Sequence, residues 1–266
     1  MTAQATLLGP RFKSRRYGKT GHGYLLDGEK VDGVTTVLNA LPKQLKQWAA
    51  DCAANYAVEH WDELAEQTLT KRLDAIRYAH KDVVGEAALR GQDIHAAGEG
   101  LVRGEPVEIP DELRGPAQAY ARFLDKYAVE QVAVEAVVGN ISNRYAGRGD
   151  LWARVGRFDG AFCYVDLKTG KNVYESTVLQ VAAYDGAEVW QPDGPDSEEP
   201  YVPVDLTFVA HILPDDVRLL PVRGVGGATK PGQPEFRTFQ YVQQISHWLG
   251  AHGWQGEEPL IEEAVR

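Results

Sequence analysis

Apolar residues recur with two different periods along the chain, and the change of period separates a helical first part from a strand-rich second part. Spacings of three and four residues predict helices at residues 43–66, 69–102 and 114–127. The second of these patterns weakens near residues 81–85, where we expect a break. One face of the first helix is expected to be buried in the core, and it consists of Leu45, Trp48, Ala49, Cys52, Ala53 and Tyr56.

From about Gln131 the apolar positions alternate with a period of two, which is typical of strands. We expect one strand to begin there and two more at residues 149–158 and 161–168, joined by a tight turn at Asp159-Gly160. The remaining predicted elements are a loop or short hairpin within residues 1–31, a helix capped by Ser176 or Thr177, strands at 202–213 and 217–222, and a last helix at 240–249. This order predicts an α/β fold.

The most informative segment is the end of the third predicted strand, Asp166-Leu167-Lys168. Six of the seven residues from 161 to 167 are apolar, so two charges stand at the end of a buried strand. Side chains alternate faces in a strand, so Asp166 and Lys168 share one face. One interpretation is an Asp–Lys pair at a solvated edge. The other is a metal-dependent hydrolytic site, in which carboxylate oxygens hold a hard cation.

Four sequence elements resemble those of the PD-(D/E)xK nuclease superfamily, in particular its RecB-like exonuclease branch. The string GRGD ends at Asp150, and VDLKTG contains Asp166 and Lys168. Upstream, residues 91–95 resemble the helical G-x-x-x-H element of this branch, and downstream, residues 180–184 resemble its Q-x-x-x-Y element. The resemblance covers about residues 85–220, with the elements in the order of the family.

The resemblance implies a restriction-endonuclease-like core, a central mixed sheet flanked by helices, with an N-terminal helical lobe. We therefore expect a basic segment and helical lobe at residues 1–84, the nuclease core at 85–223, and a C-terminal loop, helix and acidic tail at 224–266. The implied function is a metal-dependent DNA exonuclease, of a kind found in phage recombination, which processes DNA ends for a single-strand annealing protein. The alternatives are an endonuclease of the same superfamily and a non-catalytic DNA-binding or interaction module.

The resemblance also implies roles for the residues of the motifs. Asp150 and Asp166 would be carboxylate ligands of Mg²⁺ or Mn²⁺, and the backbone carbonyl of Leu167 a third ligand. Lys168 would act near the attacking water, either as a base or by stabilising charge. His95 would be a further metal ligand, and an imidazole favours transition ions such as Mn²⁺.

Other residues have two open interpretations. Glu135 joins the metal site or lies on the outward face of an edge strand. Gln180 and Tyr184 lie four residues apart on one helix face, where they contact DNA or brace the site, as does Arg148. Glu99, one helical turn after His95, orients that imidazole or is an ordinary surface acid.

Composition narrows the remaining possibilities. The 266 residues predict one compact unit, and a net charge of −10 argues against a protein that coats nucleic acid. Basic residues concentrate at 11–30 and at 144–171. Two cysteines, Cys52 and Cys163, do not suffice for the iron–sulfur cluster of some relatives. With no apolar run near the roughly 20 residues of a membrane span, we expect a cytoplasmic protein, in the bacterial host if phage-encoded, without a membrane partner. The oligomeric state is not determined by the sequence.

Overall fold

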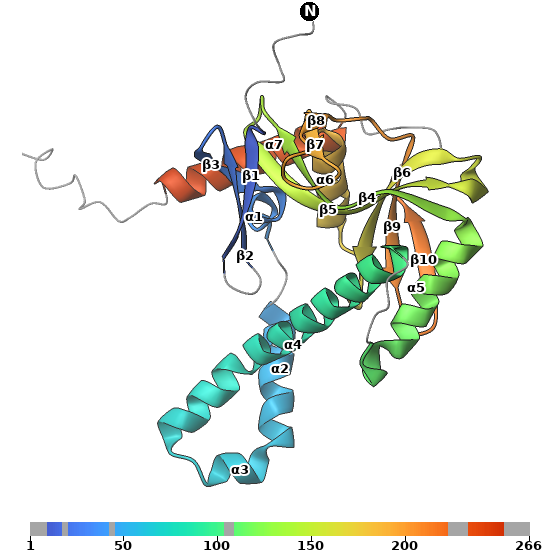
Figure 1. The fold of residues 1–266 in the computed structure, drawn as a ribbon. Coiled ribbons are helices and arrows are strands. Elements are labelled where there is room, and N and C mark those ends of the chain that lie inside the picture. Colours follow the sequence, from blue (N-terminus) through green and yellow to red (C-terminus); the bar gives the residue numbers. More distant parts are fainter. Residues whose placement is uncertain (1–9, 18–20, 43–45, 104–108, 223–233, 253–266) are drawn as a thin grey trace, which may run out of the picture.

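Ten strands of the described residues form one curled, mixed sheet with helices on both faces, in the computed structural model of the chain (Figure 1). The structure describes residues 10–17, 21–42, 46–103, 109–222 and 234–252. The expected α/β class, with a mixed sheet flanked by helices, is therefore confirmed.

Three long antiparallel strands form the middle of the sheet: β4 (Val129–Asn140), β5 (Tyr145–Val155) and β6 (Ala161–Lys168). A short 3-10 turn (Gly156–Phe158) replaces the end of the predicted second strand. Asp159 and Gly160 both adopt positive φ, as the tight turn requires. The bounds of β6 agree with the sequence prediction because alternation and turn are both local signals.

The outer strands connect distant parts of the chain. β9 (Leu206–Ile212) pairs in parallel with β6 and antiparallel with β10 (Val217–Pro221). Toward the opposite edge of the sheet, β7 (Val189–Gln191) pairs with β4 and with β8 (Glu199–Pro200). Residues that we expected as a loop or hairpin form three strands, namely β1 (Phe12–Tyr17), β2 (Gly21–Leu26) and β3 (Glu29–Gly33). β3 pairs in parallel with the first residues of β5.

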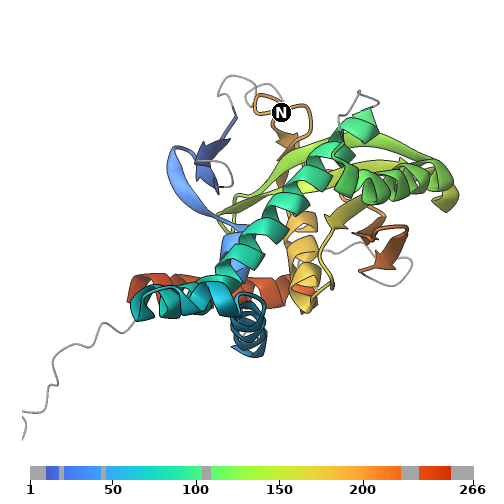
Figure 2. The same ribbon diagram turned by 90° about the horizontal axis from the view of Figure 1, so that it is seen from below.

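Helices cover the two faces of the sheet (Figures 1 and 2). One face carries Trp152, Tyr145 and Tyr164, and it packs against α1 (Val34–Leu38), α6 (Glu175–Asp185) and α7 (Pro234–His252). The segment 34–41, apolar but unassigned from sequence, thus contains α1, and Tyr174 instead of Ser176 or Thr177 precedes α6. The other face carries Leu151, Val165 and Leu167, and it packs against α5 (Arg114–Tyr127), which follows a 3-10 turn at Asp111–Leu113.

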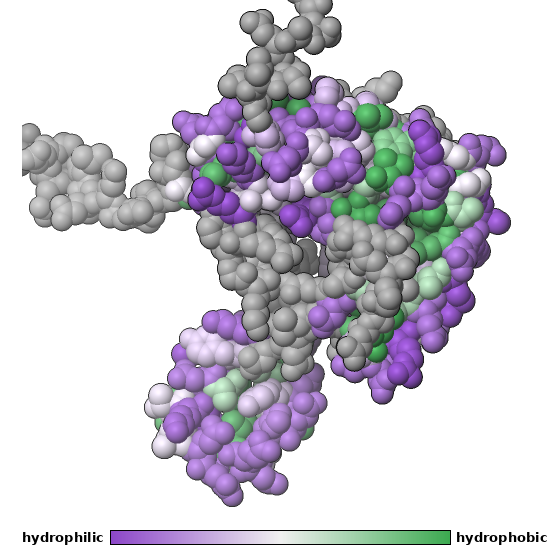
Figure 3. Space-filling view, in the orientation of Figure 1, coloured by the Kyte–Doolittle hydropathy of each residue, from purple (hydrophilic) through white to green (hydrophobic). Residues whose placement is uncertain are grey.

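A helical arm projects from the sheet, made of α2 (Lys46–Glu59), α3 (Trp61–Ala65) and the first half of α4 (Leu69–Arg103) (Figures 1 and 3). α4 is one continuous helix, so the break predicted near 81–85 is wrong. The prediction of a buried face on the first helix is also wrong, because α2 has no buried residue and Trp48 and Tyr56 are only half-buried. Leu45 of the predicted face lies outside the described residues. The rest of α2 packs mainly on α4, and contact with one helix does not enclose a side chain as a sheet does.

Candidate active site

The candidate site lies where β5 and β6 separate. The ladder between the two strands ends at the pair Leu151↔Val165, and beyond it β6 remains paired only with β9. The same edge of β5 pairs with β3 at Tyr145 and Ala146. The stretch Gly147–Asp150, which is the GRGD motif, therefore faces a gap between β3 and β6. Asp150 and Asp166 are the first residues beyond the ladder on their two strands.

Asp150 closes one side of this gap. Its Oδ2 accepts a hydrogen bond from the backbone N–H of Leu167 at 2.6 Å. The carboxylate thus takes the place that a carbonyl of a continued ladder would occupy. This bond brings a carboxylate of β5 to the Asp-Leu-Lys segment of β6, as the motif predicted.

Asp166 and Lys168 form a close ion pair in the gap. The ammonium Nζ of Lys168 lies 2.5 Å from Oδ2 of Asp166, and the Tyr164 hydroxyl donates to Oδ1 at 3.2 Å. The Asp166 side chain is 1% exposed and that of Lys168 is 27% exposed. Only the Lys168 side chain of this pair therefore reaches solvent. The Asp166 carboxylate is buried, so this half of the pair does not lie at a solvated edge.

The charges of the site act on one another. Burial lowers the pKa of Lys168. The charges of Asp166 and Asp150 and the hydrogen bond to Asp166 raise this pKa by more than burial lowers it, so the net shift is upward. Lys168 is therefore a cation in this arrangement, and the two carboxylates with one ammonium leave a formal charge of −1. A site with excess negative charge and oxygen donors has the chemistry that a hard divalent cation requires.

The helix α6 supports the site from one face through the residues of the Q-x-x-x-Y element. Nε2 of Gln180 donates to the Tyr184 hydroxyl at 3.2 Å, and the Tyr184 ring packs edge-on against Tyr164. Burial raises the pKa of Tyr184, and Tyr24, Asp166 and Asp150 raise it further. The buried Tyr184 ring therefore positions the Tyr164 ring by packing against it. Tyr164 in turn positions Asp166 through its hydrogen bond.

The two glycines of the GRGD motif make room for these rings. A Cβ at Gly147 would lie 2.4 Å from Cε1 of Tyr184, and a Cβ at Gly149 would lie 2.3 Å from Cη2 of Trp152. Both distances are shorter than any real contact. The motif therefore needs glycine because aromatic rings lie directly against the strand.

Glu135 and Arg148 lie beside the gap, on the far side of Asp150. Glu135 is half-buried with φ of 53°, and its carboxylate is 4.0 Å from Nη1 of Arg148. β4 pairs with β7 only from Val137 to Gly139, so Glu135 lies beyond that ladder, on a stretch of β4 that forms an edge of the described sheet. Among the described residues, no group of three or more His, Cys, Asp or Glu side chains is arranged to hold a metal.

The side chains of His95 and Glu99 lie outside the described residues, but the helix that carries them is placed. α4 packs on the site at Ile94, which belongs to the same apolar cluster as Leu167. A Cβ at Gly98 would lie 3.8 Å from Cδ1 of Leu167 and 3.1 Å from Cε1 of Tyr120. The helical turn that contains His95 therefore approaches the Asp-Leu-Lys segment.

Tyr120 of α5 is a residue of this region that sequence reasoning did not find. Its ring is buried, and its hydroxyl has no hydrogen-bond partner among the described residues. Burial raises the pKa of this phenol, and the charge of Asp150 raises it further. A tyrosine within a regular helical pattern indicates only core packing, so no local signal distinguishes it.

Comparisons with known proteins do not assign this chain. No protein-family profile matches the sequence, and no curated protein matches it. The solved crystal structure of SSO0001 is similar at a TM-score of 0.32 and 14% identity, over 81% of this chain and 84% of that one. In the described part of the chain, none of the helices has the length and apolar character needed to cross a bilayer.

Proposed function

We propose that the chain is a metal-dependent DNA exonuclease of the RecB-like type within the PD-(D/E)xK superfamily. The observation that carries the proposal is the convergence of Asp150, Asp166 and Lys168 at the separation of β5 and β6. These residues come from two motifs whose side chains meet only in the folded chain. Their burial and their excess negative charge support a site for a cation rather than a structural ion pair.

Asp150, Asp166 and the backbone carbonyl of Leu167 would hold Mg²⁺ or Mn²⁺. When bound, such a cation polarises the scissile phosphate and activates water for attack. All three ligands offer oxygen, which is the donor that these ions prefer. His95 is proposed as a fourth ligand on the basis of the motif and of the approach of α4 to Leu167.

The residues of the chain then have separate tasks. The Lys168 ammonium stabilises negative charge that grows on the phosphate oxygens. Tyr164 fixes Asp166 by its hydrogen bond, and Tyr184 packs behind Tyr164. Arg148, which is 27% exposed, is available to contact backbone phosphate.

Cleavage of end-labelled double- and single-stranded DNA tests this proposal, with Mg²⁺, Mn²⁺ or EDTA, for the wild type and Lys168→Ala. We expect nucleotides to be released with either ion, none with EDTA, and a loss of at least about a hundredfold in Lys168→Ala, as for removal of one charge-stabilising group. Cleavage in EDTA or full activity of Lys168→Ala would overturn the proposal.

Closed circular DNA separates the exonuclease from the endonuclease. An enzyme that starts from ends leaves a covalently closed circle intact and degrades the same DNA after linearisation. Cleavage of the closed circle would show that the protein is an endonuclease that uses the same site.

A further inference from the structure

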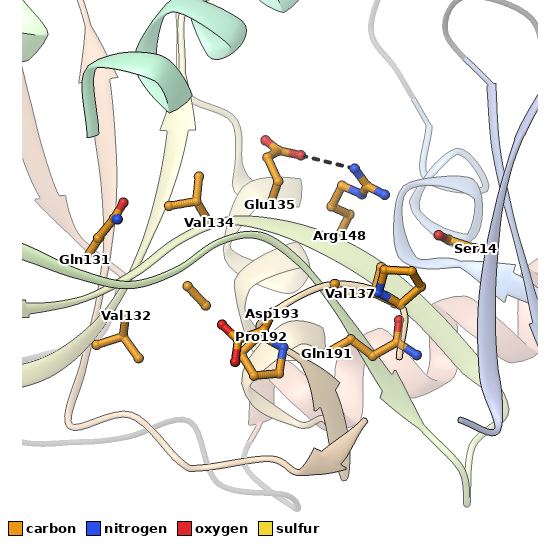
Figure 4. Close-up of a pocket in the computed structure, with 13 residues that line it drawn as sticks. Ser14, Gln131, Val132, Val134, Glu135, Val137, Arg148, Gln191, Pro192 and Asp193 are labelled. Atoms are coloured by element: carbon orange, nitrogen blue, oxygen red, sulfur yellow. Dashed lines mark ion pairs between the residues drawn. The ribbon is translucent and has the colours of Figure 1, made fainter. Parts of the chain in front are cut away.

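A second polar site lies beside the proposed active site, in a cavity of about 480 Å³ between β4, β1 and the loop that follows β7 (Figure 4). This volume is within the range of small-ligand pockets. Its position follows from the strands. Arg148 lines the cavity and precedes Asp150 by two residues on β5. The pairs Val134↔Leu151 and Ala136↔Gly149 place Glu135, another lining residue, across from Asp150.

The walls of the cavity offer both hydrogen-bond donors and acceptors. Gln191 is 2% exposed, and its Nε2 donates to the carbonyl of Phe12 at 2.8 Å. Its Oε1 accepts no hydrogen bond within the described part of the chain. The Nε of Arg148 is likewise buried without an acceptor there. A buried acceptor and a buried donor on one cavity favour a ligand that both donates and accepts.

The other walls of the cavity are formed by apolar side chains and proline rings. Val132 is the extra residue of a bulge in β4, between the paired residues Gln131 and Ala133, and it is 42% exposed. Val137 lies farther along the same strand, and Pro192 and Pro195 line the cavity from the loop. Apolar side chains and proline rings of this kind pack well against a flat ring.

We propose that this cavity binds one nucleobase of the strand whose phosphate lies at the gap between β5 and β6. A base has apolar faces for the valines and prolines, and an edge with donors and acceptors for Gln191 and Arg148. The proposal rests on the proposed nuclease function and specifies how the substrate is held next to the site. A base in this cavity is out of its base pair, so the strand is bound with that nucleotide unpaired.

The test is a scan with abasic nucleotides. A labelled single-stranded oligonucleotide is compared with versions that lack one base at successive positions, and binding is measured by fluorescence anisotropy in EDTA. In the wild type we expect one abasic position to weaken binding about tenfold, the size of a lost base contact. In Val132→Trp, where the indole fills the cavity, every abasic version should bind as the intact oligonucleotide does.

Val58→Trp is the matched control, because Val58 is 75% exposed on the helical arm and also accepts a large ring without repacking. It should keep the wild-type scan. Equal binding of all oligonucleotides by the wild type, or an unchanged scan in Val132→Trp, would overturn the proposal for the cavity. A normal scan without any metal-dependent cleavage would support the cavity and overturn the nuclease proposal, so the two failures are distinguishable.

Discussion

The carboxylate of Asp150 accepts the backbone N–H of Leu167 at 2.6 Å, across the gap where β5 and β6 no longer pair. One side chain therefore does two things. It satisfies a backbone donor that the broken ladder leaves, and it brings negative charge to Asp166 and Lys168. A substitution by asparagine separates the structural role of Asp150 from its proposed chemical role. The amide oxygen can still accept the hydrogen bond from Leu167, but it carries no negative charge.

We expect Asp150→Asn to unfold at nearly the wild-type urea concentration, since an amide oxygen can still accept from Leu167. Asp150→Ala should lose about 1–2 kcal/mol of unfolding free energy, because the N–H of Leu167 then lacks this acceptor. Both variants should lose metal-dependent cleavage. Equal stability of the two variants would show that the hydrogen bond contributes nothing, and an active Asp150→Asn would remove this carboxylate from the proposed metal site.

The Asp166–Lys168 pair predicts an energetic coupling. Lys168→Met leaves a carboxylate that is 1% exposed without its ammonium, so we expect a loss of about 3 kcal/mol in unfolding free energy. Asp166→Asn combined with Lys168→Met should cost less than the sum of the single changes, by about 1–3 kcal/mol. Urea denaturation of the four proteins measures this cycle. Additive losses would mean that the two groups do not interact in solution.

Gly147→Ala tests the packing of Tyr184 against β5. The new methyl group would lie 2.4 Å from the tyrosine ring, so the ring must move, and we expect a loss of about 1–3 kcal/mol. Gly250→Ala is the control, because no atom lies within 4 Å of a Cβ there and the residue is in α7. That variant should be neutral or more stable by about 0.5–1 kcal/mol. Thermal melts of both variants decide the point, and equal melting temperatures would contradict the close packing.

The two cysteines should differ in reactivity. Burial raises the pKa of Cys163 to about 12, with a further contribution from Asp205, and the residue is fully buried. At pH 8 its thiol is protonated and covered, whereas Cys52 is half-buried in α2. Iodoacetamide should therefore modify Cys52 in the native protein and both residues in urea, as mass spectrometry of peptides can show. Modification of native Cys163 would contradict its burial.

Manganese should stabilise the folded protein. At a concentration about a hundredfold above the dissociation constant, a ligand adds about 2.7 kcal/mol, which a thermal melt detects easily. Asp166→Ala should abolish this shift, and His95→Ala should reduce it. His80→Ala is the control on the same helix, since His80 packs against Trp48 in the arm. A full shift in His95→Ala would show that the imidazole is not a ligand.

Local sequence alone predicted the bounds of α5 and β6, the hairpin turn at Asp159-Gly160 and the position of the Asp-Leu-Lys segment at the end of a buried strand. Each depends on neighbours within a few residues, where alternation, helical spacing and turn chemistry act directly. Helical spacing gave a wrong prediction of burial at α2. An amphipathic pattern shows which face of a helix is apolar, but it does not show how much protein covers that face.

Only the tertiary structure decided that β3 and β6 share one edge of β5 and leave a gap at the GRGD motif. It also placed Tyr120 in the apolar cluster that contains Leu167, and it enclosed the cavity at Gln191 between strands from three parts of the chain. These features arise from pairing and packing between residues far apart in sequence. No local pattern contains that information, because the partner of a strand or a ring is set by how the chain returns to it.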